Sequence, residues 1–128
     1  MMQAFLVFLG GGLGAVARWA FGLTAARWLG TAWPWGTLGV NVLGSFVMGI
    51  VMATLMRGGA MTGGLENWRL FLATGILGGF TTFSAFSLES ARMIEAGHWG
   101  QAGLYGLTSV VVSIAALFAG MALGRLNG

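Results

Sequence analysis

The chain has 128 residues, of which 57% are hydrophobic and only 7% are charged, and six arginines against three glutamates leave a net charge of +3. Soluble domains carry about 25% charged residues, so this composition is that of a membrane protein. The length accommodates about four spans of roughly 20 residues, with short loops and no separate soluble domain. Thiol catalysis and disulfides are excluded because the sequence contains no cysteine.

The few polar side chains exclude most other classes of function. One histidine, His98, and three scattered glutamates form neither a metal cage nor a set of nucleophile, base and acid. The six arginines form no basic stripe, so no nucleic-acid partner is expected. We therefore expect a membrane protein that is not an enzyme and whose main surroundings are lipid.

Four apolar stretches, each long enough to cross a membrane, follow one another along the chain. They run over residues of about 3–28, 36–56, 68–95 and 99–123. The connections between them are a turn at Trp33–Pro34–Trp35, a glycine-rich loop at 57–67 and a short loop near Gly97. The expected fold class is therefore an all-α membrane protein, with residues 1–128 forming a single domain of four transmembrane helices.

The arginines are divided almost evenly between the two sides of the membrane. Four spans place Arg57, Arg69 and Arg125 on the side of the N-terminus, and Arg27 and Arg92 on the other side. The excess of positive charge that normally sets orientation is therefore almost absent. A chain of this kind is expected to insert both ways and to pair as an antiparallel, dual-topology homodimer with a two-fold axis in the membrane plane.

The segment Gly78–Ser87, in the middle of the third span, concentrates hydroxyls and phenyl rings. Its rings recur every third residue at Phe80, Phe83 and Phe86, and its hydroxyls recur one position later at Thr81, Ser84 and Ser87. On a helix these are two adjacent stripes. A single hydroxyl there usually bonds to a carbonyl one turn back. A whole block at mid-depth is expensive in lipid and indicates a substrate or ion path.

The glycines Gly75, Gly78 and Gly79, followed by two β-branched threonines, predict that the third helix is broken near its centre. A break frees backbone carbonyls and amides, which a membrane tolerates only where they line a cavity or bind something. Freed carbonyls suit a cation, whereas amides, hydroxyls and the electropositive edges of phenyl rings suit an anion. The residues alone leave both ions open.

The other spans add a few more polar side chains. Tyr105, Ser109 and Ser113 recur every fourth residue and give the last span one hydroxyl-bearing face. Asn41 places an amide at mid-depth in the second span, where it must find hydrogen-bond partners. Arg18 is the only formal charge deep in a span, so its guanidinium must pair, snorkel or face water.

The block Gly78–Glu89, with the sequence GGFTTFSAFSLE, resembles the signature of the Fluc/CrcB family of small fluoride channels. Residues 36–44 and 14–19 look like further landmarks of that family, and the resemblance covers nearly the whole chain. It implies an antiparallel dual-topology homodimer with two pores. Such a dimer passes fluoride passively out of the cell across the cytoplasmic (inner) membrane, and so reduces fluoride toxicity.

The resemblance also implies roles for individual residues. The implied fluoride pathway is lined by Asn41, Thr82, Phe83, Ser84, Phe86, Tyr105, Ser109 and Ser113. Arg18 looks like the arginine of the vestibule, and the backbone carbonyls of Gly78 and Thr81 look like ligands of a structural Na+ at the dimer interface. Phe80 departs from the family pattern, which has a variable apolar residue there. We expect its ring to pack outward, because an inward ring would crowd the pore.

Two other functions are weighed against a channel. A small multidrug-type proton-coupled exporter also has four spans and is dimeric, but it needs a carboxylate inside the membrane. The first span here carries Arg18 and no acid, and Glu89 lies near the end of its span. The remaining alternative is a non-conducting subunit of a membrane assembly.

Overall fold

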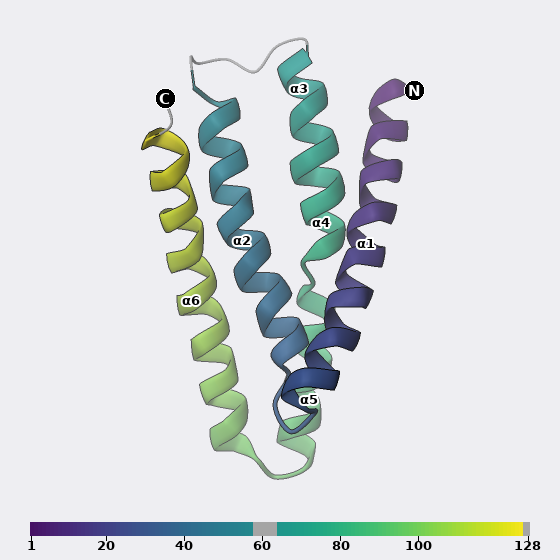
Figure 1. The fold of residues 1–128 in the computed structure, drawn as a ribbon. Helices are drawn as coiled ribbons and strands as arrows, with labels where there is room; N and C mark the ends of the chain where they lie inside the picture. The colour runs from purple at the N-terminus through teal and green to yellow at the C-terminus, as the bar shows by residue number, and fades with distance from the viewer. Residues whose placement is uncertain (58–63, 127–128) are drawn as a thin grey trace.

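A computed structural model describes residues 1–57 and 64–126, and every element in these ranges is helical (Figure 1). Four helices in the described ranges are long and apolar enough to cross a membrane: α1 (Met2–Leu29), α2 (Trp35–Leu55), the third span Gly64–Glu95 and α6 (Trp99–Leu126). The start of α1 and the end of α6 lie at the same end of the bundle (Figure 1). The predicted all-α class with four membrane-spanning helices is confirmed.

The third span bends and consists of joined pieces: α3 (Gly64–Arg69), the π-helical segment η1 (Leu70–Leu77), α4 (Gly78–Phe80) and α5 (Phe83–Glu95). Between α4 and α5 the backbone is extended at Thr81, with φ −83° and ψ 158°, and at Thr82, with φ −151° and ψ 123°. The helical coil is interrupted at this point in Figure 1. The two threonines therefore lie outside helical geometry at the centre of the bundle.

The expected glycine-rich loop at 57–67 falls mostly on residues 58–63, which lie outside the described ranges. The helix has already begun at Gly64, upstream of the expected start near Trp68. Glu66 and Arg69 stabilise this first turn through two hydrogen bonds, of 2.6 and 3.0 Å, between the guanidinium and the carboxylate. A carboxylate in the first turn also interacts favourably with the positive end of the helix dipole.

The helices pack as two pairs, α2 with α6 and α1 with the first half of the third span (Figure 1). Glycines let the backbones approach in both pairs. A Cβ on Gly49 of α2 would overlap the carbonyl oxygen of Leu117, and a Cβ on Gly14 of α1 would overlap that of Ile76. In lipid, where no hydrophobic effect drives helices together, such close contacts supply much of the attraction between them.

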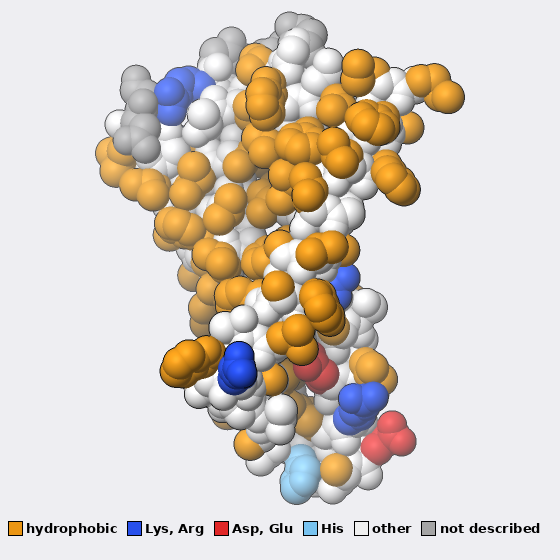
Figure 2. All heavy atoms as spheres, turned by 45° about the vertical axis from the view of Figure 1, so that its right-hand side comes forward, with side chains coloured by type: hydrophobic (Ala, Val, Ile, Leu, Met, Phe, Trp, Pro, Cys, Tyr) orange, Lys and Arg blue, Asp and Glu red, His pale blue; other side chains and the backbone are white. Residues whose placement is uncertain are grey.

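Large apolar side chains cover much of the outer surface. Figure 2 shows hydrophobic side chains over most of the upper and middle part of one face, whereas the charged side chains and the histidine gather mainly in its lower part. Only Val40 and Tyr105 are large side chains that are fully buried among the described residues. Because lipid is as apolar as a protein core, these outward residues are in a favourable solvent.

We expect the substitution Gly49→Leu to destabilise the packing of α2 on α6. Any side chain at this position meets the backbone of Leu117 and Met121, which cannot turn aside. Overpacking of this kind costs about 1–3 kcal/mol. Thermal unfolding in detergent, followed by circular dichroism, measures the loss. The control is Gly103→Leu on α6, where an added Cβ meets nothing within 4 Å. Equal midpoints for the two variants would contradict the close approach.

Candidate functional site

Asn41 of α2 holds the extended part of the third span through two hydrogen bonds. Its Nδ2 donates to the carbonyl oxygen of Thr82 at 2.9 Å, and its Oδ1 accepts from the Thr82 amide at 2.7 Å. The side-chain amide therefore replaces the backbone partners that Thr82 would have in a helix. Both polar groups of the Thr82 backbone are therefore satisfied within the protein, as a membrane-spanning segment requires.

Two backbone carbonyls lose their usual helical donors at the same bend. In a continuous helix the Thr82 amide would bond to the carbonyl of Gly78, and the Ala85 amide to that of Thr81. Instead, Thr82 donates to Asn41, and Ala85 donates to the hydroxyl of Thr82 at 3.2 Å. The carbonyls of Gly78 and Thr81 are thus left without those two donors, and carbonyl oxygens are suitable ligands for an alkali cation.

Arg18 of α1 reaches the bend from the other side. Its Nε donates to the carbonyl oxygen of Gly79 at 3.1 Å. Arg18 and Thr82 both line a pocket of about 280 Å³. The guanidinium therefore has a backbone acceptor deep in the bundle, as an arginine within a span requires. Its positive charge stays close to the extended threonines.

A groove of about 500 Å³ opens between α2, α5 and α6, and we call it the groove below. Its polar side chains come from three parts of the chain: Asn41, Ser45, Thr81, Thr82, Ser109 and Ser113. Phe83 and Phe86 complete the lining, with their ring centroids 5.6 Å apart. Phe83 is 77% exposed, so the groove reaches the outer surface of this subunit.

Tyr105 of α6 separates the groove from a second pocket. Its side chain is fully buried, with ring centroids 4.9 Å from Phe86 and 5.6 Å from Trp33. Its hydroxyl donates to Oε1 of Glu89 at 3.1 Å. Phe86 lines the groove, whereas Trp33 and Glu89 line the second pocket. An ion moving from one cavity to the other would therefore pass close to Tyr105.

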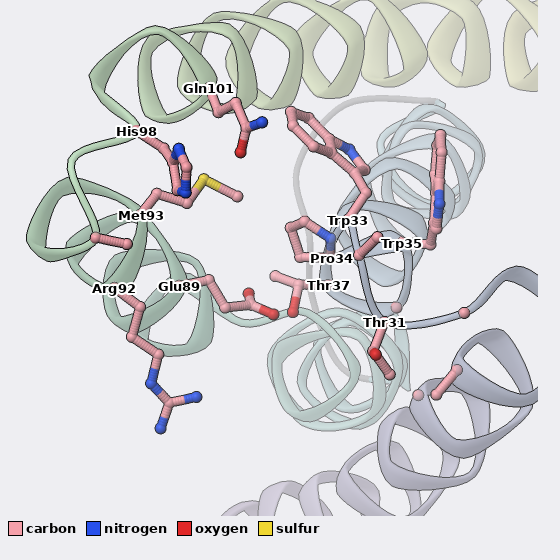
Figure 3. Close-up of a pocket in the computed structure, with 16 residues that line it drawn as sticks. Thr31, Trp33, Pro34, Trp35, Thr37, Glu89, Arg92, Met93, His98 and Gln101 are labelled. Atoms are coloured by element: carbon pink, nitrogen blue, oxygen red, sulfur yellow. The ribbon is translucent and has the colours of Figure 1, made fainter.

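The second pocket, which we call the mouth pocket, has a volume of about 550 Å³ and lies where the connection between α1 and α2 meets that between α5 and α6. Figure 3 shows the Glu89 carboxylate turned toward Thr37, with His98 and Gln101 on one side and Trp33 nearby. Sequence reasoning did not connect Glu89 to Tyr105, which lies 16 residues further along the chain. Periodicity within one helix does not reveal a contact between two helices.

Three serine hydroxyls are buried without a hydrogen-bond partner among the described residues: Ser90, Ser109 and Ser113. Leaving a buried hydroxyl unbonded costs about 1–3 kcal/mol. Serines on helices commonly avoid this cost by bonding back to a carbonyl, as Ser87 does to Phe83 at 3.0 Å. Because Ser109 and Ser113 line the groove, their unbonded hydroxyls lie in its wall.

Comparison with known proteins identifies the family. Residues 5–121 match the family model described as CrcB-like protein, Camphor Resistance (CrcB). The chain belongs to the CrcB family. It is 55% identical over 126 residues to a protein of Phenylobacterium zucineum (strain HLK1) named "Fluoride-specific ion channel FluC", a match that covers 98% of this chain and 97% of that protein.

Two further relatives agree over the same length. A protein of Caulobacter sp. (strain K31) with the same name is 49% identical, over 98% of this chain and 96% of its own. A protein of Nitrobacter hamburgensis (strain DSM 10229 / NCIMB 13809 / X14), named "Fluoride-specific ion channel FluC 2", is 51% identical, over 97% of this chain and 98% of its own. This CrcB-family chain, with its four apolar helices, is a multi-pass membrane protein.

The structure brings six of the eight pathway residues expected in this CrcB-family chain together in the groove: Asn41, Thr82, Phe83, Phe86, Ser109 and Ser113. Tyr105 lies at the end of the groove, against Phe86. Ser84 is exposed and is connected to the groove only through a 3.2 Å hydrogen bond with the Thr82 hydroxyl.

Phe80 lies away from the groove, in keeping with the expectation that its ring does not crowd a pore. It is half-buried and packs edge-to-face on Phe21 of α1, with ring centroids 6.1 Å apart. The reason is the close approach of α1 and α4, where a Cβ on Gly79 would overlap the carbonyl oxygen of Gly11.

We expect Asn41→Asp to release the extended segment. The substitution replaces the Nδ2 donor with a carboxylate oxygen that repels the Thr82 carbonyl, and the lost hydrogen bond reduces local stability by about 1–3 kcal/mol. Amide hydrogen exchange of the peptide around Thr82 should become faster. Gln101→Glu makes the same chemical change in the mouth pocket and should leave this exchange unaltered. Unchanged exchange in Asn41→Asp would show that the two bonds do not hold the bend.

Proposed function

We propose that this protein is a fluoride channel, which lets fluoride leave the cell passively across the cytoplasmic membrane and so limits its toxicity. The observation that carries the proposal is the groove, where uncharged donors from α2 and α6 meet two phenyl rings from α5. Relatives that are 49–55% identical over nearly the whole chain bear a fluoride-channel name, and none of these names describes an enzyme.

The chemistry of the groove suits a small, hard and strongly hydrated anion. Stripping water from fluoride requires several close donors at once. The Ser109 and Ser113 hydroxyls have no protein partner among the described residues, and one of the two N–H groups on Asn41 Nδ2 bonds to Thr82. The positive edges of phenyl rings add weak attraction without a full charge. Conduction requires binding of this intermediate strength, because a deeply bound ion would not leave.

We assign Arg18 to the vestibule. Arg18 lines the pocket next to the groove and not the groove itself, and Thr82 lines both cavities. The charge of Arg18 can therefore raise the local concentration of anions at the entrance without acting as a ligand that traps fluoride inside. The bond to the Gly79 carbonyl holds the guanidinium in this position.

The proton-coupled exporter is less well supported. Its chemistry needs a carboxylate that shares the substrate site and exchanges protons there. Glu89 lies in the mouth pocket, outside the groove, and accepts a hydrogen bond from Tyr105. The Glu66 carboxylate, at the opposite end of the third span, is paired with Arg69.

We further propose that the channel is an antiparallel, dual-topology homodimer. The groove carries Asn41, Ser109 and Ser113 but reaches the outer surface of a single subunit, where lipid would leave these polar groups unsatisfied. A second copy would supply the missing wall and would cover Phe83. The near balance of arginines on the two sides of the membrane favours insertion in both orientations.

A structural Na+ at the dimer interface fits the bend of the third helix, which we regard as a functional helix break. Its ligands would be the carbonyls of Gly78 and Thr81 from both subunits. The redirected amides of Thr82 and Ala85 support this choice, because they leave these two oxygens without their helical donors. When bound, the cation would supply a positive charge that offsets the partial negative charge of these carbonyl oxygens.

The channel proposal predicts fluoride release from liposomes that contain the pure protein and a potassium ionophore, measured with a fluoride electrode. We expect Phe83→Ile and Phe86→Ile each to lower the flux by roughly 2- to 10-fold, because an aliphatic side chain offers no positive ring edge. Phe118→Ile is the matched control, since Phe118 is an exposed ring on α6 outside the groove. Wild-type flux in both pore variants removes the rings from the path. A wild-type protein that releases no fluoride leaves the non-conducting assembly subunit as the better explanation.

The dual-topology proposal can be tested directly because the sequence contains no cysteine. Leu65→Cys and Gln101→Cys place single thiols at opposite ends of the bundle. A maleimide that does not cross membranes should label about half of each variant in sealed vesicles, since the two orientations are expected in equal numbers. Both variants must still conduct fluoride. Complete labelling of one position and none of the other would mean a single orientation.

A further inference from the structure

The hydroxyl of Ser90 on α5 is buried and has no hydrogen-bond partner among the described residues, yet Ser90 lines neither the groove nor the mouth pocket. It shares this unsatisfied state with Ser109 and Ser113, which do line the groove. The hydroxyl of Ser87, one turn away on the same helix, is satisfied because it donates to the carbonyl oxygen of Phe83. The hydroxyl of Ser90 makes no such bond, so it remains able to donate to a ligand.

Along α5, Ser90 lies between residues that line the groove and residues that line the mouth pocket. Phe83 and Phe86 precede it and line the groove, whereas Glu89 and Met93 lie on either side of it and line the mouth pocket. With 3.6 residues per turn, Ser90 projects on nearly the same side of α5 as Phe83, about 10 Å further along the axis. Phe86, one turn before Ser90, already contacts Tyr105 of α6.

The passage from the groove to the mouth pocket needs a donor at this point. Tyr105 stands between the cavities, but its hydroxyl proton is directed at Glu89. An anion that leaves Ser109 would therefore meet the Tyr105 hydroxyl, whose proton is already donated to Glu89. It would also meet the Glu89 carboxylate, whose negative charge repels it. A free hydroxyl on the facing helix would offset this loss of donors.

We propose that the Ser90 hydroxyl is a further anion-binding position, which takes fluoride between the groove and the mouth pocket. This inference rests on the proposed channel function and adds one residue to its path. The ligand is a small halide that has lost part of its water shell, because the position offers a single neutral donor one helical turn from Phe86.

The test compares three variants by fluoride flux and by thermal unfolding in detergent. Ser90→Ala should lower flux by about 2- to 10-fold, the effect expected for one hydrogen bond. Its unfolding midpoint should be unchanged or higher, because the substitution removes an unsatisfied buried hydroxyl. Ser90→Thr keeps the hydroxyl and should conduct near the wild-type rate. Ser87→Ala, the matched control, loses an exposed hydroxyl that is already bonded to its own helix and should also conduct normally.

The outcomes separate this inference from the channel proposal. If the wild-type protein conducts and Ser90→Ala conducts equally well, Ser90 is not on the path and the inference alone fails. A fall in flux together with a lower unfolding midpoint in Ser90→Ala would mean that the hydroxyl serves packing, and this too overturns the inference. If the wild-type protein releases no fluoride, the channel proposal and the inference fail together.

Discussion

The two hydrogen bonds between Asn41 and the backbone of Thr82 hold the centre of the third span in an extended conformation. A membrane helix normally satisfies all its backbone groups internally, and a departure from that pattern must be compensated by side chains. Here one amide side chain supplies both an acceptor and a donor. As long as it does so, Thr82 caps α5, Arg18 can reach the Gly79 carbonyl, and the carbonyls of Gly78 and Thr81 lack their helical donors.

The same requirement for satisfied polar groups explains why the groove needs further partners. The hydroxyls of Ser109 and Ser113 are buried but have no partner among the described residues, and one of the rings in the groove is largely exposed. In lipid they are costly unless an ion and a second protein surface fill the space. The proposed fluoride would bond to the free hydroxyls, and the proposed partner subunit would cover the exposed side of the groove.

The arrangement of charge divides the proposed path into regions with different tasks. Arg18 lies beside the bend, where its charge would attract anions to the proposed path. The polar side chains of the groove are neutral donors, and Glu89 occupies the mouth pocket beyond Tyr105. Fluoride would therefore meet full charges near the groove rather than inside it. Weak, repeated binding along neutral groups allows an ion to enter and also to leave.

Some of this description follows from the sequence alone. Composition and the lengths of the apolar stretches determine a membrane protein with four helical spans, because an apolar stretch of about 20 residues crosses the bilayer as a helix that satisfies its own backbone. The spacing of residues within one helix also predicts local stripes, such as Tyr105, Ser109 and Ser113, because that periodicity depends on helix geometry alone. The glycines and threonines of the third span point to irregular backbone there for the same local reason.

The tertiary structure decides how residues from different helices meet. Asn41 and Thr82 are 41 residues apart, and Glu89 and Tyr105 are 16 residues apart, so no period within one helix relates them. The packing of Phe80 on Phe21 depends on how closely α1 approaches α4. The sequence determines which polar groups would cost free energy if they were left unbonded in the membrane. Helix packing decides which of those groups satisfy one another and which remain free for an ion.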